Sequence, residues 1–180
     1  MAQKQTDKEE KPEWPSEIFE ILKEAEISQI SYVPDAGHSD LIKFCLADNR
    51  MKTTRLTTEE EGVALSLGAW LGGDRSALLM QSSGVGNCIN MLSIIQETRS
   101  PLLMLVTMRG EWGEFNPWQL PMGQGTAQSL RDGGMIVYHV DKAEELGETI
   151  FAAAQIAFNS YRSVAVLIGQ RIIGFKDWRK

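Results

Sequence analysis

Three consecutive glutamates, Glu59, Glu60 and Glu61, stand immediately before a segment that is almost wholly apolar. This pattern predicts the start of a helix, because the first backbone N–H groups of a helix lack partners and its dipole favours carboxylates there. Thr58 and Glu61 have the spacing of a capping box. Glu60 is expected to face solvent, and the glycine pair at 72–73 to end the helix.

Glu59 has no part in this capping scheme. It follows residues 53–58, which read as a strand, and a carboxylate at a strand-to-helix junction of an α/β sheet points into the ligand-binding crevice. A carboxyl group in an apolar crevice has its charged form disfavoured, so it can share a proton with a weak base. Two interpretations stay open at this point, an acid–base carboxyl and a solvated first turn.

The segment QSSGVGN, residues 81–87, is expected to be a loop between a strand and a helix. Gly84 and Gly86 would let the backbone approach a ligand at the helix N-terminus. The third glycine of a dinucleotide-binding fingerprint is missing, because Ile89 occupies that position. A ligand loop and a tight packing turn are both compatible with the residues.

A second irregular segment, RGEWGEFNPWQLPMGQG, is expected to form a long loop over residues 109–125. Long loops in compact domains are usually functional or interfacial. Trp112, Phe115 and Trp118 therefore indicate a partner surface or a ligand wall, unless all three fold back on the core.

The two histidines and two cysteines allow few alternatives. His38 follows a predicted turn, where it is an active-site residue or an exposed loop residue, whereas His139 lies in an apolar strand and is expected to be structural. Cys45 and Cys88 fall in predicted helices, which suits a reducing cytosol and excludes a disulfide scaffold or a cysteine-based zinc site. Cys88 near a helix start could be a thiol of lowered pKa, but a small core residue is the preferred interpretation.

Composition indicates one globular domain. The chain has 180 residues, 43% of them hydrophobic and 23% charged, with a net charge of −6. This charge argues against a nucleic-acid or membrane-surface protein. Residues 1–14 are polar and are expected to be a flexible tail rather than a signal peptide, and no apolar run reaches the length of a membrane span. We therefore expect a cytoplasmic protein.

Strand and helix patterns alternate along the rest of the chain, so residues 15–180 are expected to form one three-layer α/β/α domain with a parallel six-stranded sheet. The predicted strands are 27–34, 53–58, 76–81, 101–108, 135–140 and 163–169. Besides the glutamate helix, helices are predicted at 15–26, 39–49, 86–98, 124–132 and 143–160.

Four segments carry a resemblance to a known family: VPDAGHSDLI, TTEEEGVALSLGAWLGG, LLMQSSGVGNCINML and RGEWGEFNPWQLPMGQ. They resemble the alpha subunits of sulfopyruvate decarboxylases, and they are similar to the N-terminal part of phosphonopyruvate decarboxylases. Both are thiamine-diphosphate enzymes. The resemblance runs from about residue 15 to the end, and it implies a pyrimidine-binding (PYR) domain with six parallel strands.

The resemblance also implies roles for single residues. In this superfamily a glutamate at that helix start binds N1′ of the cofactor's aminopyrimidine, and a helix glycine lies nine residues later. Gly68 lies nine residues after Glu59, so Glu59 is predicted to be catalytic, with Glu60 as second choice, and His38 is predicted to assist. The predicted cofactor-binding residues are Glu59, Pro34, Asp35, Ala36, Ser83, Gly84, Gly86 and Asn87. The predicted substrate residues are Arg109, Asn116, Gln119 and Gln124, which could hold a second anionic group.

The magnesium site of this superfamily is a Gly-Asp-Gly motif with downstream asparagines in a second (PP) domain. Here GGD at 72–74 and DGG at 132–134 have the wrong order. No metal ligands are expected in this chain, so a PP-type beta subunit should supply the Mg²⁺ ligands for thiamine diphosphate in a hetero-oligomer. The substrate is expected to be a 2-oxo acid such as sulfopyruvate or phosphonopyruvate. The alternatives are a carboligase or other ylide enzyme of the same fold, or a non-catalytic nucleotide-binding module.

Overall fold

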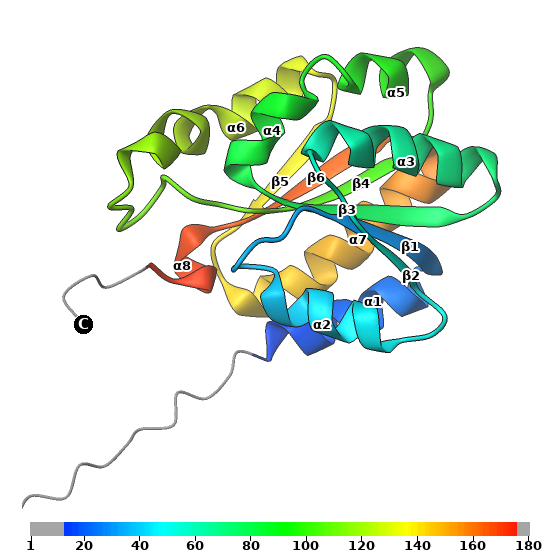
Figure 1. Cartoon of the computed structure of the whole chain (residues 1–180), viewed down its shortest axis with the longest axis horizontal. Coiled ribbons are helices and arrows are strands. Elements are labelled where there is room, and N and C mark those ends of the chain that lie inside the picture. The colour runs from blue at the N-terminus through cyan, green and yellow to red at the C-terminus, as the bar shows by residue number, and fades with distance from the viewer. Residues whose placement is uncertain (1–12, 176–180) are drawn as a thin grey trace, which may run out of the picture.

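Six parallel strands form one sheet in the order β2-β1-β3-β4-β6-β5, shown in Figure 1. The structure is a computed structural model that describes residues 13–175. The strands are β1 (Ile27–Tyr32), β2 (Lys52–Arg55), β3 (Arg75–Gln81), β4 (Leu102–Thr107), β5 (Ile136–Val140) and β6 (Ser163–Ile168). The predicted parallel sheet is confirmed.

Helices cover both faces of the sheet (Figure 1). One layer holds α1 (Trp14–Glu24), α2 (Ser39–Ala47) and α7 (Leu146–Ser160). The other holds α3 (Glu59–Leu71), α4 (Ser82–Cys88), α5 (Leu92–Thr98) and α6 (Leu120–Asp132). Short helical turns complete the chain: η1 (Pro117–Gln119), η2 (Ala143–Glu145) and α8 (Gln170–Ile173). This is the expected three-layer α/β/α arrangement.

The central strands are buried along their whole length. Every residue of β4 and of β6 is buried, because each strand has a helical layer on both sides, as the continuous apolar run of β4 predicted. Trp14 is 5% exposed and begins α1, so the first helix starts one residue before the predicted Pro15. The rest of the predicted tail, residues 1–12, lies outside the described residues.

All six strands run in the same direction, so the segments that follow them meet at one edge of the sheet. From β1 the chain crosses to β2 on one side, and it then returns past β1 to β3. Such a reversal opens a crevice between the carboxyl ends of the two strands. The loop after β1, the first turn of α3 and the start of α4 all lie at this edge.

Two loop predictions are wrong. Residues 81–87 are not a loop, because α4 begins at Ser82, and the predicted helix 86–98 is broken into α4 and α5. Glycine disfavours a helix by about 1 kcal/mol, and packing against α3 and α6 overrides that preference here. The predicted loop 109–125 is helical from Pro117 onward, where prolines begin η1 and α6.

Within the described residues, no helix is long and apolar enough to cross a membrane.

Substitutions at two glycines of α6 test the backbone contact between this helix and the loop after β4. A Cβ atom on Gly123 would lie 2.1 Å from the backbone oxygen of Arg109, whereas a Cβ on Gly125 would meet nothing within 4 Å. We expect Gly123→Ala to lower the free energy of unfolding by about 1–3 kcal/mol, because the backbone must move. Gly125→Ala is the control and should raise it by up to about 1 kcal/mol. Urea denaturation measures both, and equal effects would contradict the close backbone contact.

Candidate active site

The three glutamates of α3 have three different surroundings. Glu61 accepts the backbone N–H groups of residues 57–58 at 2.8 and 3.4 Å, which confirms the capping box. Glu59 accepts a hydrogen bond of 2.7 Å from the side-chain amide of Asn87 in α4. Oε2 of Glu60 is buried and has no hydrogen-bond partner within the described part of the chain. Glu60 as a whole is half-buried, so the prediction that it faces solvent holds only in part.

Glu59 lies directly against the backbone of α4. A Cβ atom at Gly84 would be 2.3 Å from Oε1 of Glu59, so any side chain there would push this carboxylate out of its observed position. Of the predicted cofactor-binding segment, Gly84 and Asn87 thus contact Glu59. Gly86 instead faces Met122 of α6, and the Ser83 hydroxyl accepts a hydrogen bond from Gln81.

Cys88 lies beneath the same helix turn and is completely buried. Burial raises the pKa of its thiol to about 12, and the nearby carboxylates of Glu59 and Glu60 act in the same direction. The thiol is therefore protonated at neutral pH and unreactive. The reactive-thiol alternative is wrong, and Cys88 is a core residue.

The loop after β1 holds a buried polar cluster. Oδ2 of Asp35 accepts a hydrogen bond from the hydroxyl of Thr107 in β4, and it lies 3.4 Å from Nδ1 of His38. Burial alone would raise the pKa of Asp35, but the contacts with His38 and Thr107 outweigh it and lower the pKa below its usual value. Pro34 and Ala36, on either side, are exposed.

His38 has no exposed surface, and neither ring nitrogen has a hydrogen-bond partner within residues 13–175. The interpretation as an exposed loop histidine is therefore wrong. In this conformation no substrate reaches the ring, and its charged neighbour is Asp35. The fold brings Asp35 and His38 together beneath the surface.

Arg109 pairs with a carboxylate of its own chain. Its Nε and Nη2 donate to the two oxygens of Glu114 at 2.6 and 2.9 Å. Burial opposes ionisation of Glu114, but the bonds from Arg109, from the Asn116 backbone and from Gln170 outweigh it and lower its pKa to about 2. The predicted anion-binding charge of Arg109 is thus already compensated.

The other predicted substrate residues do not converge on one point. The Asn116 side chain accepts the backbone N–H of Trp118 at 3.2 Å and so caps η1. Gln119 accepts a hydrogen bond of 3.1 Å from Gln81 at the end of β3. Gln124 donates to the Gly110 carbonyl at 2.7 Å and lines a cavity on the other side of the loop.

The aromatic residues of this segment are partly or fully exposed. Trp118 is 84% exposed, Phe115 48% and Trp112 39%, so the alternative in which all three fold back on the core is wrong. Trp112 packs edge-to-face against Phe175 with ring centroids 5.0 Å apart. Trp118 has the greatest exposure and is free to contact a partner.

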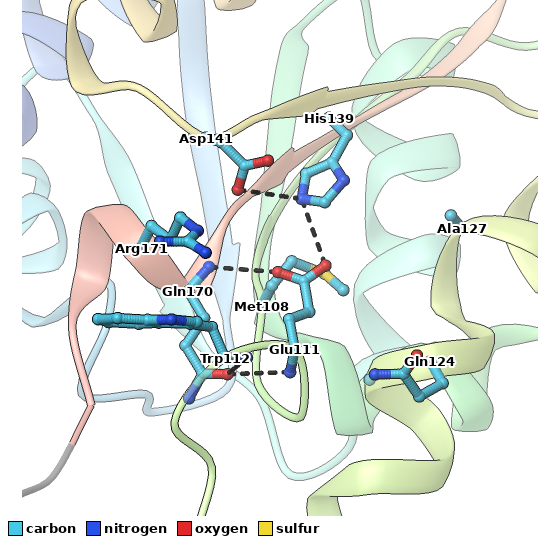
Figure 2. Close-up of a pocket in the computed structure, with 10 residues that line it drawn as sticks. Met108, Glu111, Trp112, Gln124, Ala127, His139, Asp141, Gln170 and Arg171 are labelled. Carbon is cyan, nitrogen blue, oxygen red and sulfur yellow. Dashed lines mark hydrogen bonds and ion pairs between the residues drawn. The ribbon is translucent and has the colours of Figure 1, made fainter.

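A cavity of about 390 Å³ lies at the carboxyl ends of β4, β5 and β6 (Figure 2). His139 lies on its wall, with Nε2 3.3 Å from Glu111 and 3.8 Å from Asp141. These ion-pair contacts are compatible with the structural role that the sequence predicted. The hydrogen bond with Glu111 raises the pKa of His139. Gln170, which sequence reasoning missed, is 1% exposed and binds the backbone of residues 111–112.

The parallel α/β/α fold and the sequence together place the chain in the class of thiamine-diphosphate-binding domains. The family model described as "Pyruvate flavodoxin/ferredoxin oxidoreductase, thiamine diP-bdg" matches residues 34–174. The sulfopyruvate decarboxylase subunit alpha of Methanococcus maripaludis is 30% identical over 152 residues, which cover 84% of this chain and 91% of the relative. The chain belongs to this thiamine-diphosphate-binding family, and specifically to the family of sulfopyruvate decarboxylase alpha subunits.

One further relative and one solved structure are also similar to this chain. The phosphonopyruvate decarboxylase of Streptomyces viridochromogenes is 34% identical over 106 residues, which are 58% of this chain and 27% of that protein. A 2-oxoglutarate:ferredoxin oxidoreductase structure from Magnetococcus marinus superposes with a TM-score of 0.74 at 16% identity, over 89% of this chain and 29% of that chain. The latter likeness shows the fold.

The Arg109–Glu114 pair predicts a pH-dependent contribution to stability. Because the folded-state pKa of Glu114 is about 2, below its usual 4.5, the contribution is complete above about pH 4.5 and is lost as the pH falls toward 2. We expect Glu114→Gln to lower the free energy of unfolding by about 2 kcal/mol at neutral pH. The difference in the free energy of unfolding between this variant and the unsubstituted chain should become smaller as the pH falls.

Urea denaturation between about pH 7 and pH 3 measures this difference. Glu148→Gln, at an exposed glutamate of α7, is the control and should change stability by less than about 0.5 kcal/mol. A Glu114→Gln deficit that stays constant across this range would show that the ion pair is not its cause.

Proposed function

We propose that this chain is the alpha, PYR-type subunit of a two-subunit thiamine-diphosphate-dependent decarboxylase. Its substrate is a 3-substituted 2-oxo acid such as sulfopyruvate or phosphonopyruvate, and its products are the aldehyde and CO2. Family membership and the names of the relatives support this class. The observation that carries the proposal is the buried oxygen of Glu60 that accepts no hydrogen bond within the described residues.

A buried carboxylate oxygen without a donor costs about 1–3 kcal/mol, and such exceptions in proteins call for an explanation such as a functional role. The oxygen fits a cofactor ring nitrogen with which it can share a proton, and N1′ of the aminopyrimidine is such a group. Glu59, the first choice from sequence, already accepts a hydrogen bond from Asn87. Gly68, whose spacing favoured Glu59, contacts no neighbouring side chain that would require glycine. We therefore assign N1′ to Glu60.

Thiamine diphosphate, when bound, supplies the nucleophilic carbon and the electron sink that decarboxylation needs. In this proposal, the residues of this chain hold the cofactor and orient it. Glu60 keeps a proton shared with N1′, and the Glu59–Asn87 bond fixes α3 against α4 beside it. Asp35, held by Thr107, lies at the end of the neighbouring strand β1, with His38 behind it as a positioning residue.

The magnesium ligands belong to a second, PP-type subunit in this proposal. Asp74 and Asp132, the aspartates of the two reversed motifs, precede β3 and β5 and therefore lie at the amino edge of the sheet, opposite the glutamates. Asp74 there accepts a hydrogen bond of 2.6 Å from Gln29. Mg²⁺ needs several oxygen ligands close to the diphosphate, and a beta subunit that faces the carboxyl edge would supply them.

The exposed aromatic residues at the same edge suit this partner. Trp118, Phe115 and Leu120 are 84%, 48% and 42% exposed and follow one another closely in the chain. Aromatic side chains are enriched at protein interfaces. We propose that they contact the beta subunit, which would close the crevice over Glu60.

The proposal is tested by co-purifying the chain with a candidate beta subunit that carries a Gly-Asp-Gly motif. CO2 release from sulfopyruvate, phosphonopyruvate and pyruvate is then measured with and without thiamine diphosphate and Mg²⁺. Release that needs both subunits and both cofactors is expected. Tight Mg²⁺-dependent cofactor binding by the isolated chain would contradict the two-subunit arrangement, and ligation to an added aldehyde without net release would identify a carboligase.

Three matched substitutions in the assembled enzyme distinguish the roles of the three glutamates. Glu60→Gln should lower kcat by about 10²–10⁴-fold, as expected for loss of an acid–base group. Glu59→Gln should have a smaller effect, because an amide can still pair with Asn87. Glu61→Gln is the control, with a small loss of stability from the cap and near-normal kcat. If Glu59→Gln abolishes turnover and Glu60→Gln does not, the assignment to Glu60 is wrong.

The proposed partner surface gives a separate prediction. Trp118→Ala should weaken association with the beta subunit by about 30-fold or more, as expected for a tryptophan at the centre of an interface. The thermal stability of the isolated chain should not change, because the side chain is exposed. Leu71→Ala, at a leucine that is 77% exposed at the far end of α3, is the control. Equal affinities for the two variants in a titration would place the interface elsewhere.

A further inference from the structure

Three side chains that could bind a metal ion converge on the cavity at the other end of the carboxyl edge (Figure 2). Glu111 comes from the segment after β4, His139 from the end of β5, and Asp141 from the residue that follows β5. The sheet order places β6 between β4 and β5, so the chain reverses direction here a second time. This cluster shares no residue with the proposed thiamine-diphosphate site.

The geometry of the three groups is close to that of a coordination site. One atom from each lies within 4.8 Å of the other two. Nε2 of His139 is 3.3 Å from Oε1 of Glu111 and 3.8 Å from Oδ1 of Asp141. Ligand atoms at about 2.0–2.2 Å from a metal lie roughly 3.0–3.5 Å apart from one another, so adjustments of about 1 Å would bring all three atoms within reach of one ion.

Glu111 is fixed in this orientation by a buried glutamine. Oε2 of Glu111 accepts the backbone N–H of Gln170 at 3.2 Å, which leaves Oε1 of Glu111 directed at His139. The side-chain oxygen of Gln170 accepts the backbone N–H groups of Glu111 and Trp112, both at 3.0 Å. Gln170 is 1% exposed, so the loop and the carboxylate are held before any ion binds. Hydrogen bonds of this kind orient the ligands in known metal sites.

Gly169 leaves space for the carboxylate of Asp141. A Cβ atom at Gly169 would lie 2.3 Å from Oδ1 of Asp141, the same oxygen that faces His139. A side chain at position 169 would therefore push this carboxylate away from the cluster. Two of the three groups thus have a local feature that sets the position of the oxygen nearest the imidazole.

The charges of the cluster also favour a cation. Two carboxylates approach one imidazole, and no lysine or arginine in residues 13–175 forms an ion pair with either of them. Arg171 lines the same cavity, but its guanidinium lies over the ring of Trp112, 4.9 Å from the centroid. We propose that Glu111, His139 and Asp141 bind one divalent transition-metal ion.

One imidazole and two carboxylates suit Zn²⁺ or Mn²⁺ better than Mg²⁺, which prefers oxygen ligands alone. Three protein ligands leave coordination positions open toward the cavity of about 390 Å³, where water or a small oxygen ligand can bind. The ion would join the segment after β4 to the end of β5. Because Trp112 directly follows Glu111, the ion would also order the aromatic segment.

The test uses the full-length chain, free of any affinity tag and dialysed against a chelator. Isothermal titration with Zn²⁺, Mn²⁺ and Mg²⁺ is carried out at about pH 8, because a histidine ligand must be neutral. We expect one Zn²⁺ per chain and weaker binding of Mg²⁺. His139→Gln and Glu111→Gln should each lower the affinity for Zn²⁺ by at least about tenfold. Glu144→Gln, at an exposed glutamate of η2, is the control and should bind as the unsubstituted chain does.

A second readout is independent of any activity. Zn²⁺ should raise the melting temperature of the unsubstituted chain, since it binds the folded state, and it should not raise that of His139→Gln. Far-UV circular dichroism checks that the variants are folded. The proposal is overturned if the unsubstituted chain binds no stoichiometric Zn²⁺ or Mn²⁺, or if His139→Gln binds them equally well. In either case the three residues form ion pairs with one another and do not bind a metal ion.

Discussion

The contact between the Glu59 carboxylate and the backbone of Gly84 sets the geometry of the whole crevice edge. It brings the first turn of α3 against α4, and the hydrogen bond from Asn87 secures it. Successive residues of a helix point about 100° apart, so fixing Glu59 also fixes the directions of its two neighbours. Glu61 then reaches back to the cap, and Glu60 turns inward to a place without a donor. The contact at Gly84, the hydrogen bond from Asn87 and the capping box together leave one oxygen of Glu60 without a donor within the described residues.

The strands were predictable because their signals are local. The continuous apolar run of β4 showed that both faces are covered, and the six predicted strands agree with the structure apart from a few terminal residues. The start of α4 was not predictable in the same way, because Ser82 to Cys88 contain two glycines that disfavour a helix. Packing against α3 and α6 overrides that preference. The pairing of His139 with Glu111 could not be predicted from the sequence either, because Glu111 comes from a segment that is distant along the chain.

The substrate residues show a further limit of sequence reasoning. Arg109 has the right charge to hold an anionic group, but Glu114 already occupies two of its hydrogen-bond donors and compensates that charge. Two charge-assisted hydrogen bonds and a pKa of about 2 show how strongly that carboxylate is held. Glu114 also accepts a hydrogen bond from Gln170 and so belongs to the frame of the loop. The charge of Arg109 was visible in the sequence, whereas its pairing with Glu114 and Gln170 appears only in the folded chain.

The same parallel order that assembles the crevice also accounts for the division of labour that we propose. Every carboxyl end lies at one edge, so acid–base and pyrimidine contacts gather there, while the aspartates of the reversed motifs lie at the opposite edge. Asp74 and Asp132 are separated from the carboxyl edge by the length of the strands that follow them. In the proposed enzyme, the diphosphate and its metal are therefore held by the partner that faces the carboxyl edge. The exposed Trp118 lies on the segment that such a partner would meet first, which ties the missing ligands and the uncovered aromatic surface to a single cause.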